Sequence, residues 1–432
     1  MKFAHIADAH LGAFSKNRAL REFNLRAFEL AVEKSIEENV DFIIIAGDLF
    51  HNPLPDMSIA NSAVSILNRA RDAGIRIYVV YGSHDSSAGT TSLLDVLATT
   101  GLFQKVVNYR VVEGKLQLIP VEDPTGVRIV GVPGLTSAME VRYFNEDIID
   151  REFLESIPSP KIFVFHTTVT ELKPSYISER KDVPLSKFPR GFDYYAGGHL
   201  HERIEYEFNG APLRYTGALF GSSYTDLERF ANLEHGFYIV EDFKPKFVPV
   251  KVCDFEVHKV NASGLSASKL EEKLIEIADR EHKNRVVILK VYGELKSGKR
   301  GDIDFQKIRE LILRSASDAL INTYALTTAE RRKLTVSGSS EDEIENRVFA
   351  EISDYGLDFT HSLFHVLKEE KSSEESNDDF KARIWSAAST LIENARRVDR
   401  NVEKDVVNKD EGNKNEKSVP RKDLFDFLGD AR

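Results

Sequence analysis

The first hundred residues alternate short apolar runs with stretches of helical periodicity. Residues 42–46 are continuously apolar, which is typical of a strand covered on both faces, and residues 2–7 and 75–81 have a similar character. Between these runs, residues 18–38 and 58–73 repeat apolar side chains at helical spacing. This strand–helix–strand order predicts a layered α/β sheet.

The pattern continues further along the chain. A second region starts near Lys251, where a helix at 270–278, a strand at 285–292 and a helix at 305–315 predict a small α/β unit. Four more strands are predicted before it, at residues 127–132, 161–165, 214–216 and 236–240.

The character of the chain changes after residue 329. A polar linker or cap at 337–343 precedes two amphipathic helical patterns, at 344–355 and 384–398. Residues 401–421 are almost wholly polar and charged, which predicts disorder, and a short apolar cluster follows at 424–428.

Composition narrows the class of protein. The chain has 432 residues, too many for one core, and its 42% hydrophobic and 29% charged residues are ordinary for globular proteins. The single cysteine, Cys253, excludes an intrachain disulfide. The apolar runs are far shorter than a membrane span. We therefore expect a cytoplasmic protein without membrane association.

Net charge at first argues against a nucleic-acid partner, because it is −11. Residues 341–432 hold 23 acidic and 15 basic residues, so they carry −8 of this total and the preceding body only −3. Any DNA-binding surface would then be a local basic patch assisted by bound cations.

Polar side chains gather where the predicted strands end, which is where ligand sites of α/β sheets lie. Carboxylate with imidazole is a ligand set for divalent manganese, iron or zinc, and the absence of cysteine among these residues excludes a structural thiolate zinc site. Glycines at 47, 82, 197 and 198 fit tight turns beside a metal or phosphate. The residues concerned are Asp8, His10, Asp48, His51, His84, Asp85, His166, His199 and His201.

The ordered blocks Asp-x-His, Gly-Asp, Gly-x-His-Asp, His and Gly-His-x-His resemble the calcineurin-like metallophosphoesterases. Within them, the chain looks most like the double-strand-break repair nucleases called SbcD in bacteria and meiotic recombination eleven elsewhere. Residues 8–12, 47–51, 215–217 and 234–237 carry this likeness. It is close over residues 1–240 and one of layout only beyond Lys251. A related fold that has lost its metals is the alternative.

The resemblance implies a layered β-sandwich flanked by helices, with two divalent metal ions, most suitably Mn²⁺, at the site. Two ions can clamp the attacking and leaving oxygens of an in-line displacement. One ion would be held by Asp8, His10 and His201 and the other by His166 and His199, with Asp48 bridging them.

The remaining site residues receive roles from the same resemblance. His84 would protonate the leaving oxygen while Asp85 orients its ring, and His51 would position the substrate. Ser83 departs from the family pattern, which has an asparagine ligand there. We expect Ser83 or a water molecule to complete a weaker second metal site.

The resemblance also implies an organisation and partners. We expect DNA ends as substrate, a homodimer formed by the helices at 58–73 and 91–102, an SMC-like ATPase of the Rad-fifty or SbcC type, and a prokaryotic source, with an archaeon favoured. The expected regions are a nuclease domain at 1–245, a capping α/β domain that binds DNA at 251–335, an ATPase-binding helical region at 340–398 and a disordered tail at 399–432.

Several alternatives stay open. The protein could be a phosphodiesterase of small molecules, although such an enzyme would not need the region after Lys251. It could be a DNA-end tethering scaffold whose nuclease is weak because of Ser83. The helices at 58–73 and 91–102 could simply pack in the core, and the tail helices could pack on the protein's own α/β unit.

Overall fold

The structure is a computed structural model of the chain, and it describes residues 1–86, 91–177, 181–328, 349, 357–369 and 379–392. The chain divides into two compact units, Met1–Glu330 and Arg331–Arg432. Among the described residues, no helix is both long and apolar enough to cross a membrane.

The larger unit contains a first six-stranded sheet, whose strand order is β14-β13-β1-β2-β3-β4. β1, β2, β3 and β4 run parallel, whereas β13 and β14 are antiparallel to their neighbours. The strands are β1 (Lys2–Ile6), β2 (Phe42–Ala46), β3 (Arg76–Val80), β4 (Gln104–Lys105), β13 (Gly236–Glu241) and β14 (Lys244–Pro249).

A second six-stranded sheet has the order β11-β12-β10-β9-β8-β7, with β8, β9, β10 and β12 parallel. A separate antiparallel hairpin, β5 (Tyr109–Val112) and β6 (Lys115–Leu118), lies outside it. The strands of this sheet are β7 (Val121–Glu122), β8 (Arg128–Val132), β9 (Lys161–His166), β10 (Tyr194–Gly198), β11 (Ile204–Phe208) and β12 (Ala211–Tyr215).

The two sheets pack face to face through an apolar layer. Phe42 and Ile44 of β2 share this buried cluster with Ile162 and Val164 of β9. Every residue of β2 is buried because helices cover the other face of the sheet, which explains its uninterrupted apolar sequence. The expected layered sandwich is confirmed.

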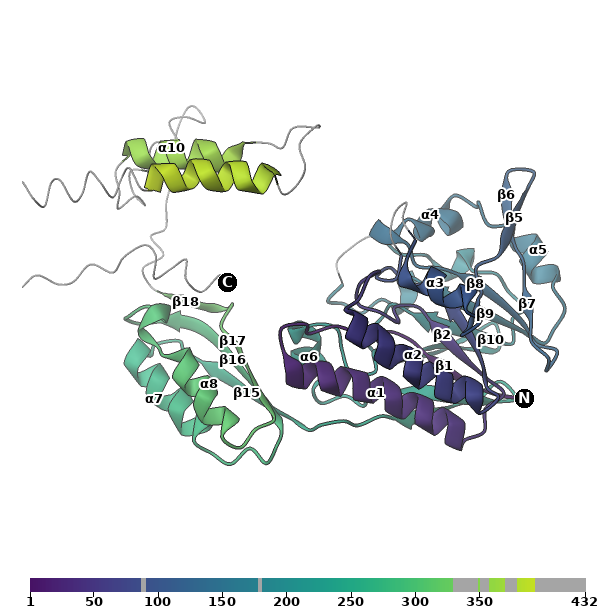
Figure 1. The fold of residues 1–432 in the computed structure, drawn as a ribbon, viewed down its shortest axis with the longest axis horizontal. Helices are drawn as coiled ribbons and strands as arrows, with labels where there is room; N and C mark the ends of the chain where they lie inside the picture. Colours follow the sequence, from purple (N-terminus) through teal and green to yellow (C-terminus); the bar gives the residue numbers. More distant parts are fainter. Residues whose placement is uncertain (87–90, 178–180, 329–348, 350–356, 370–378, 393–432) are drawn as a thin grey trace, which may run out of the picture. The chain divides into compact units, whose positions relative to one another are not determined.

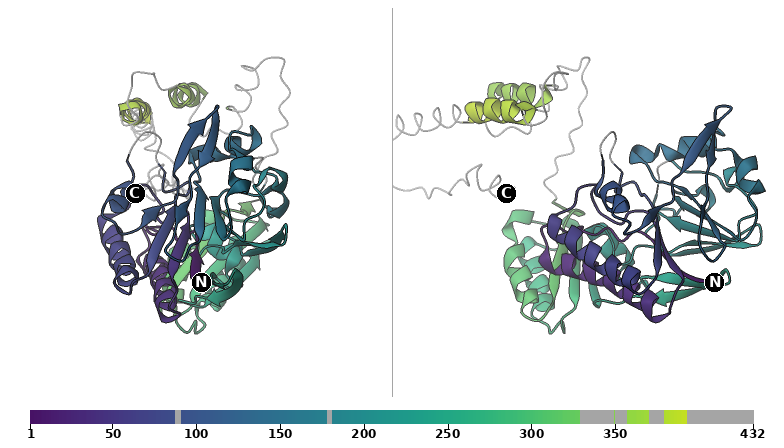
Figure 2. Two further views of the ribbon diagram at one scale, coloured as in Figure 1. Left: turned by 90° about the vertical axis from the view of Figure 1, so that its right-hand side faces the viewer. Right: turned by 45° about the vertical axis from the view of Figure 1, so that its right-hand side comes forward.

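Helices cover the outer faces of both sheets. α1 (Arg18–Glu37) and α2 (Met57–Asp72) lie side by side on the first sheet, where Phe28 and Ala63 pack with Ile43 and Ile45 (Figures 1 and 2). The short helices α4 (Glu140–Asn145) and α5 (Arg151–Ser156) pack on the second sheet. Two further helices, α3 (Leu93–Thr99) and α6 (Tyr224–Phe230), add to the first core.

The apolar residues that suggested a dimer contact have a different place. Ile59, Ile66, Leu94 and Leu97 are buried in the protomer's own core, so this motivation for the contact was wrong. Their helical spacing marks the face of each helix that packs into the core, not a surface for a second copy.

A parallel α/β unit completes the larger unit. Its sheet has the order β15-β16-β17, with β18 also paired to β16. α7 and α8 cover one face, while Phe255 and Ile288 on the other face join the core beneath α1. Glu228 of α6 reinforces this contact by accepting a hydrogen bond from Asn322 (2.7 Å) and pairing with Lys290. The elements are β15 (Phe255–Asn261), α7 (Ala267–Ala278), β16 (Val286–Leu295), α8 (Phe305–Leu313), β17 (Asp318–Asn322) and β18 (Leu326–Thr328).

The smaller unit contains two described helices, α10 (Leu357–Lys368) and residues 379–392. The sequence did not predict α10. The helix predicted at 384–398 is confirmed as far as residue 392, and the one predicted at 344–355 lies outside the described residues apart from Phe349. The ring of Phe349 contacts Phe364 of α10, with 5.1 Å between the ring centroids.

Candidate metal centre

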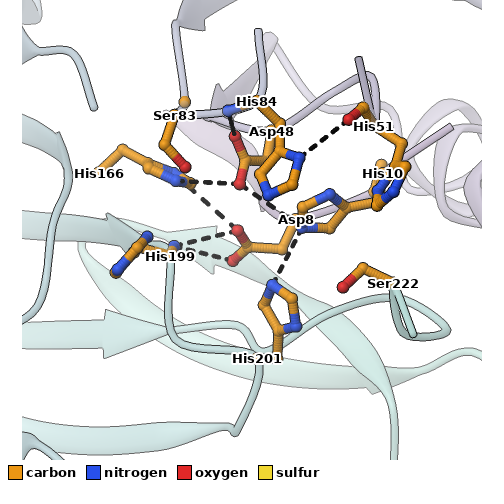
Figure 3. A network of polar contacts seen from close by, with 12 residues as sticks. Asp8, His10, Asp48, His51, Ser83, His84, His166, His199, His201 and Ser222 are labelled. Atoms are coloured by element: carbon orange, nitrogen blue, oxygen red, sulfur yellow. Dashed lines mark hydrogen bonds and ion pairs between the residues drawn. The ribbon is translucent and has the colours of Figure 1, made fainter. Parts of the chain in front are cut away.

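Parallel pairing brings the polar residues together. β1, β2 and β3 run parallel in one sheet, and β9 and β10 run parallel in the other, so their carboxyl ends meet at one edge of the sandwich. The segment after β1 is tied to the segment after β2, because the backbone N–H of His10 donates to the carbonyl of Asp48 (2.8 Å). Figure 3 shows side chains from both sheets converging on this edge.

Four of the converging residues have left-handed backbone conformations. The φ angles are 52° at Asp8, 45° at His10, 50° at Asp48 and 95° at His199. Such conformations are costly for residues other than glycine, and they cluster at functional sites where the surrounding fold imposes them. The strand ends are therefore shaped to aim side chains at a common point.

Two glycines give these side chains their space. A Cβ atom on Gly47, whose φ is 89°, would lie 2.1 Å from Nδ1 of His166, and one on Gly82 would lie 2.0 Å from Oδ1 of Asp48. The backbone at these two positions approaches candidate ligand side chains closely, so any larger residue would displace them.

The first group of ligand atoms consists of Asp8, His10 and His201, which lie within 4.8 Å of one another. Nε2 of His10 is 2.9 Å from Nε2 of His201. The other ring nitrogen of His201 contacts Oδ2 of Asp226 at 2.9 Å. Although burial disfavours the charged ring, this hydrogen bond raises the pKa of His201. A carboxylate behind a ligating histidine fixes the tautomer and increases the basicity of the metal-facing nitrogen.

The second group consists of Asp8, Asp48 and His166, all buried. Nε2 of His166 lies 3.2 Å from Oδ2 of Asp48, while Nδ1 is held by the carbonyl of Ala46 at 2.9 Å. The ring of His199 stands beside that of His166, with 5.1 Å between their centroids. Its backbone N–H donates to both oxygens of Asp8 at 3.0 Å.

His84 and His51 line the open side of the site. The backbone N–H of His84 donates to Asp48 (2.8 Å), and its ring Nδ1 contacts the carbonyl of His51 at 2.9 Å. The two rings are stacked, with centroids 5.0 Å apart. His84 is exposed and His51 is half-buried. A proton on Nδ1 is thereby used internally, which leaves Nε2 for the substrate.

Asp85 does not orient the His84 ring as expected. Its buried carboxylate accepts backbone N–H groups of Leu49 (3.2 Å), Phe50 (2.9 Å) and Gly82 (3.0 Å). It therefore joins the loops after β2 and β3 from beneath, and the His51 carbonyl takes the ring-orienting position. The resemblance had suggested Asp85 for this role, but its carboxylate is occupied by these backbone N–H groups.

Burial shapes the ionisation of the site. It raises the pKa of Asp8 to about 6, and burial with the nearby Asp48 raises the pKa of Asp85 to about 7. Burial and then the neighbouring His166 lower the pKa of His199 to about 3. Despite its own burial, His166 has a pKa raised to about 10 by Asp48. Cation binding would have to release that proton.

The residues fit a pair of divalent cations. His10 Nδ1 and His166 Nε2 are buried without a hydrogen-bond partner among the described residues. Buried polar atoms are normally satisfied, so the orphaned Nε2 of His166, which lies 3.2 Å from Oδ2 of Asp48, indicates a ligand. Ser83 lies beside His166 at the same edge (Figure 3).

The sequence did not predict two contributors to the site. Asp226 supports His201 and accepts from the Ser222 hydroxyl (2.8 Å), and no motif marks it because it lies in α6, far from the strand ends. Gly134 lies against His166, where a Cβ atom would be 2.4 Å from the ring. The sequence could have indicated Gly134 as a site residue because it follows the predicted strand at 127–132.

Comparison with known proteins supports this assignment. Residues 1–203 match the calcineurin-like phosphoesterase family. A DNA double-strand break repair protein Mre11 from Archaeoglobus fulgidus is 27% identical over 396 residues, covering 87% of this chain and 82% of that protein. The comparisons support a repair nuclease of the SbcD and Mre11 type, in which residues 1–203 are a calcineurin-like phosphoesterase domain. This confirms the resemblance noted in the motifs.

Two further relatives have the same name. The Mre11 of Methanococcus maripaludis is 25% identical, covering 88% of this chain and 99% of that protein. The Mre11 of Methanopyrus kandleri is 28% identical, covering 63% and 61%. Members of the calcineurin-like metallophosphoesterases use divalent metal ions, and this chain is a metal-dependent phosphodiesterase.

Proposed function

We propose that this protein is a DNA nuclease of double-strand-break repair that uses two divalent ions, most suitably Mn²⁺, and has exonuclease and endonuclease activity. The observation that carries the proposal is the share of this chain that aligns with its relatives, because an Mre11 aligns over 87% of it. That coverage includes sequence beyond the phosphoesterase domain, which a small-molecule phosphodiesterase would not need.

The proposed ligand set extends the two groups of ligand atoms described above. Asp8, His10 and His201 would hold one ion and His166 the other, with Asp48 shared between them. His199, whose ring stands beside that of His166, would complete the second site. Two such ions lower the pKa of a water molecule and polarise the phosphate. Asp226 would keep His201 deprotonated at Nε2, and the left-handed backbone would keep Asp8 and Asp48 aimed inward.

His84 and His51 would act on the substrate. The His51 carbonyl holds Nδ1 of His84, so Nε2 of His84 can carry a proton to the leaving 3′ or 5′ oxygen. The half-buried ring of His51, stacked on His84, would contact a phosphate. Asp85 would keep the loops that carry both histidines in place.

Ser83 favours one alternative. Its hydroxyl is shorter than the asparagine amide of the family pattern, so the second ion would bind more weakly. The protein would then tether DNA ends and cleave them slowly. The capping region, the homodimer and an SMC-like ATPase partner suit either role, as does an intracellular location.

The test is cleavage of linear single-stranded and double-stranded DNA with Mn²⁺, Mg²⁺ or chelator. We expect Mn²⁺-dependent cleavage that Asp48→Ala abolishes, and two manganese ions per chain that the variant loses. Cleavage of small phosphodiesters but not DNA would overturn the proposal. DNA binding with cleavage restored by Ser83→Asn would identify the tethering role.

A further inference from the structure

A cluster of metal-ligand side chains lies in the α/β unit, away from the centre described above. Glu256 and His258 are two residues apart on β15, so both face the side of the sheet that α7 and α8 cover. His282 comes from the turn between α7 and β16. β15 is an edge strand, which leaves this corner open to solvent on one side.

The three side chains point to a common position. Oε1 of Glu256 is 2.7 Å from Nε2 of His258 and 3.3 Å from Nδ1 of His282, and all three ligand atoms lie within 4.8 Å of one another. The side chains of Glu256 and His258 are 20% and 21% exposed. An ion could therefore reach the cluster from solvent.

His282 gives the independent sign of a ligand. Its side chain is 0% exposed, yet neither ring nitrogen has a hydrogen-bond partner within the described ranges. A fully buried imidazole without partners loses its hydration with no compensation. Its Nδ1 is directed at Glu256 without the geometry of a hydrogen bond, which a shared cation would explain.

We propose that Glu256, His258 and His282 bind a zinc ion. Zn²⁺ accepts two histidines and one glutamate in tetrahedral sites that keep a fourth position for water, and imidazole favours it over Mg²⁺. At zinc–ligand distances of about 2.0–2.1 Å, tetrahedral ligand atoms are roughly 3.3 Å apart. The Glu256–His282 separation has this value, whereas the 2.7 Å between Glu256 and His258 would have to lengthen for both to bind one ion.

The surrounding backbone holds the cluster in place. The His282 N–H donates to the hydroxyl of Ser315 (2.9 Å), and its carbonyl accepts from the N–H of Arg285 (3.0 Å). The Arg285 guanidinium lies 3.6 Å from Oε2 of Glu256, whereas Oε1 contacts His258 at 2.7 Å and His282 at 3.3 Å, so the ion would replace these direct contacts. Zinc would thus fasten the edge strand to the α7–β16 turn, independently of the phosphoesterase site.

The test is zinc stoichiometry of the full chain after equilibration with Zn²⁺ and removal of excess metal. We expect three ions per chain for the wild type and two for His258→Ala, whose side chain is partly exposed. His365→Ala, which removes an exposed histidine of α10, is the matched control and should keep three.

A second measurement separates this site from the first. In the Asp48→Ala protein one ion should remain, Co²⁺ in its place should give the visible absorption of a tetrahedral site, and zinc should raise the melting temperature. His258→Ala and His282→Ala, each combined with Asp48→Ala, should remove these signals. Retention of the third ion in both combinations, or its absence from the wild type, would overturn the proposal.

Discussion

Three histidine rings in the phosphoesterase site are oriented by a contact of their second nitrogen. Ala46 holds His166, Asp226 holds His201, and the His51 carbonyl holds His84. Each contact selects which nitrogen faces the centre. Positioning and ligation are therefore separate tasks in this site, and they can be tested separately.

Replacing His84 by glutamine should affect catalysis without affecting the metals. General acid catalysis contributes about 10²–10⁴-fold, so we expect a loss of that order in cleavage rate with unchanged manganese content. Metal analysis and single-turnover cleavage check this, with His365→Gln as the control. A near wild-type rate would remove His84 from the proposed mechanism.

Replacing Asp226 by asparagine should weaken metal binding through His201. Losing such a supporting carboxylate typically costs 10–100-fold in metal affinity, and we expect this at pH 8. The raised pKa of His201 means that its proton stabilises the metal-free fold below about pH 6.5 and is lost as pH rises. Wild-type affinity should consequently rise with pH, and less steeply in the variant. Calorimetric titration with Mn²⁺ at pH 6 and pH 8 measures the affinity of each protein and its change with pH. An equal change with pH in the wild type and the variant would contradict the role assigned to Asp226.

The sequence was informative about these residues to different degrees. The candidate ligands could be predicted because the chemistry needs carboxylates and imidazoles and because strand ends are visible as the ends of apolar runs. The supporting contacts of Asp226 and Asp85 could not, since they depend on how distant loops meet.

At the scale of elements, the helices around the first sheet bury one face in the core and expose the opposite face to solvent. Leu54, Met57 and Val96 are 76%, 71% and 51% exposed on or beside α2 and α3. Adjacent exposed apolar residues are typical of an interaction surface. We therefore propose that the homodimer contact uses these residues instead of the buried ones.

The double variant Met57→Asp, Val96→Asp should be monomeric at micromolar concentration, because charges would be buried without partners in the contact. Light scattering should show a dimer for the wild type. Ser65→Asp, on an exposed position of α2, is the control and should stay dimeric. A wild-type monomer with intact cleavage would exclude this contact.

Elements were predicted best where the pattern was simple. β2 has the bounds expected from its apolar run, and α1 agrees within one residue. The strands β11, β14 and β15 were not predicted. Each is a partly exposed edge strand that mixes polar with apolar residues and lacks a clear period.

At the scale of the whole molecule, the larger unit has its own cores and ends at Glu330, while the smaller unit presents little buried surface among its described residues. Trp385 on the helix at 379–392 is 65% exposed, whereas Ala388 is buried. A tryptophan on such a surface is a common anchor for a partner. This supports the proposed binding of an SMC-like ATPase.

Deleting residues 340–432 should preserve Mn²⁺-dependent cleavage of single-stranded DNA and abolish co-purification with the ATPase. Trp385→Ala in the full chain should weaken binding by about 30-fold or more, in keeping with a hot spot worth at least 2 kcal/mol. Tyr324→Ala, an exposed aromatic residue outside the deleted segment, is the control. Unchanged affinity in the truncated protein would show that the ATPase binds elsewhere.

The division of ligands between the sheets has a consequence for the lifetime of the protein in a cell. Asp8, His10 and Asp48 follow strands of one sheet, and His166, His199 and His201 belong to the other. Cations held by these residues, as proposed above, would link two halves that an apolar layer also joins. Without the cation, the protein would be degraded more readily by proteases and would also be inactive. The supply of the cation would therefore set both the amount of the enzyme and its activity.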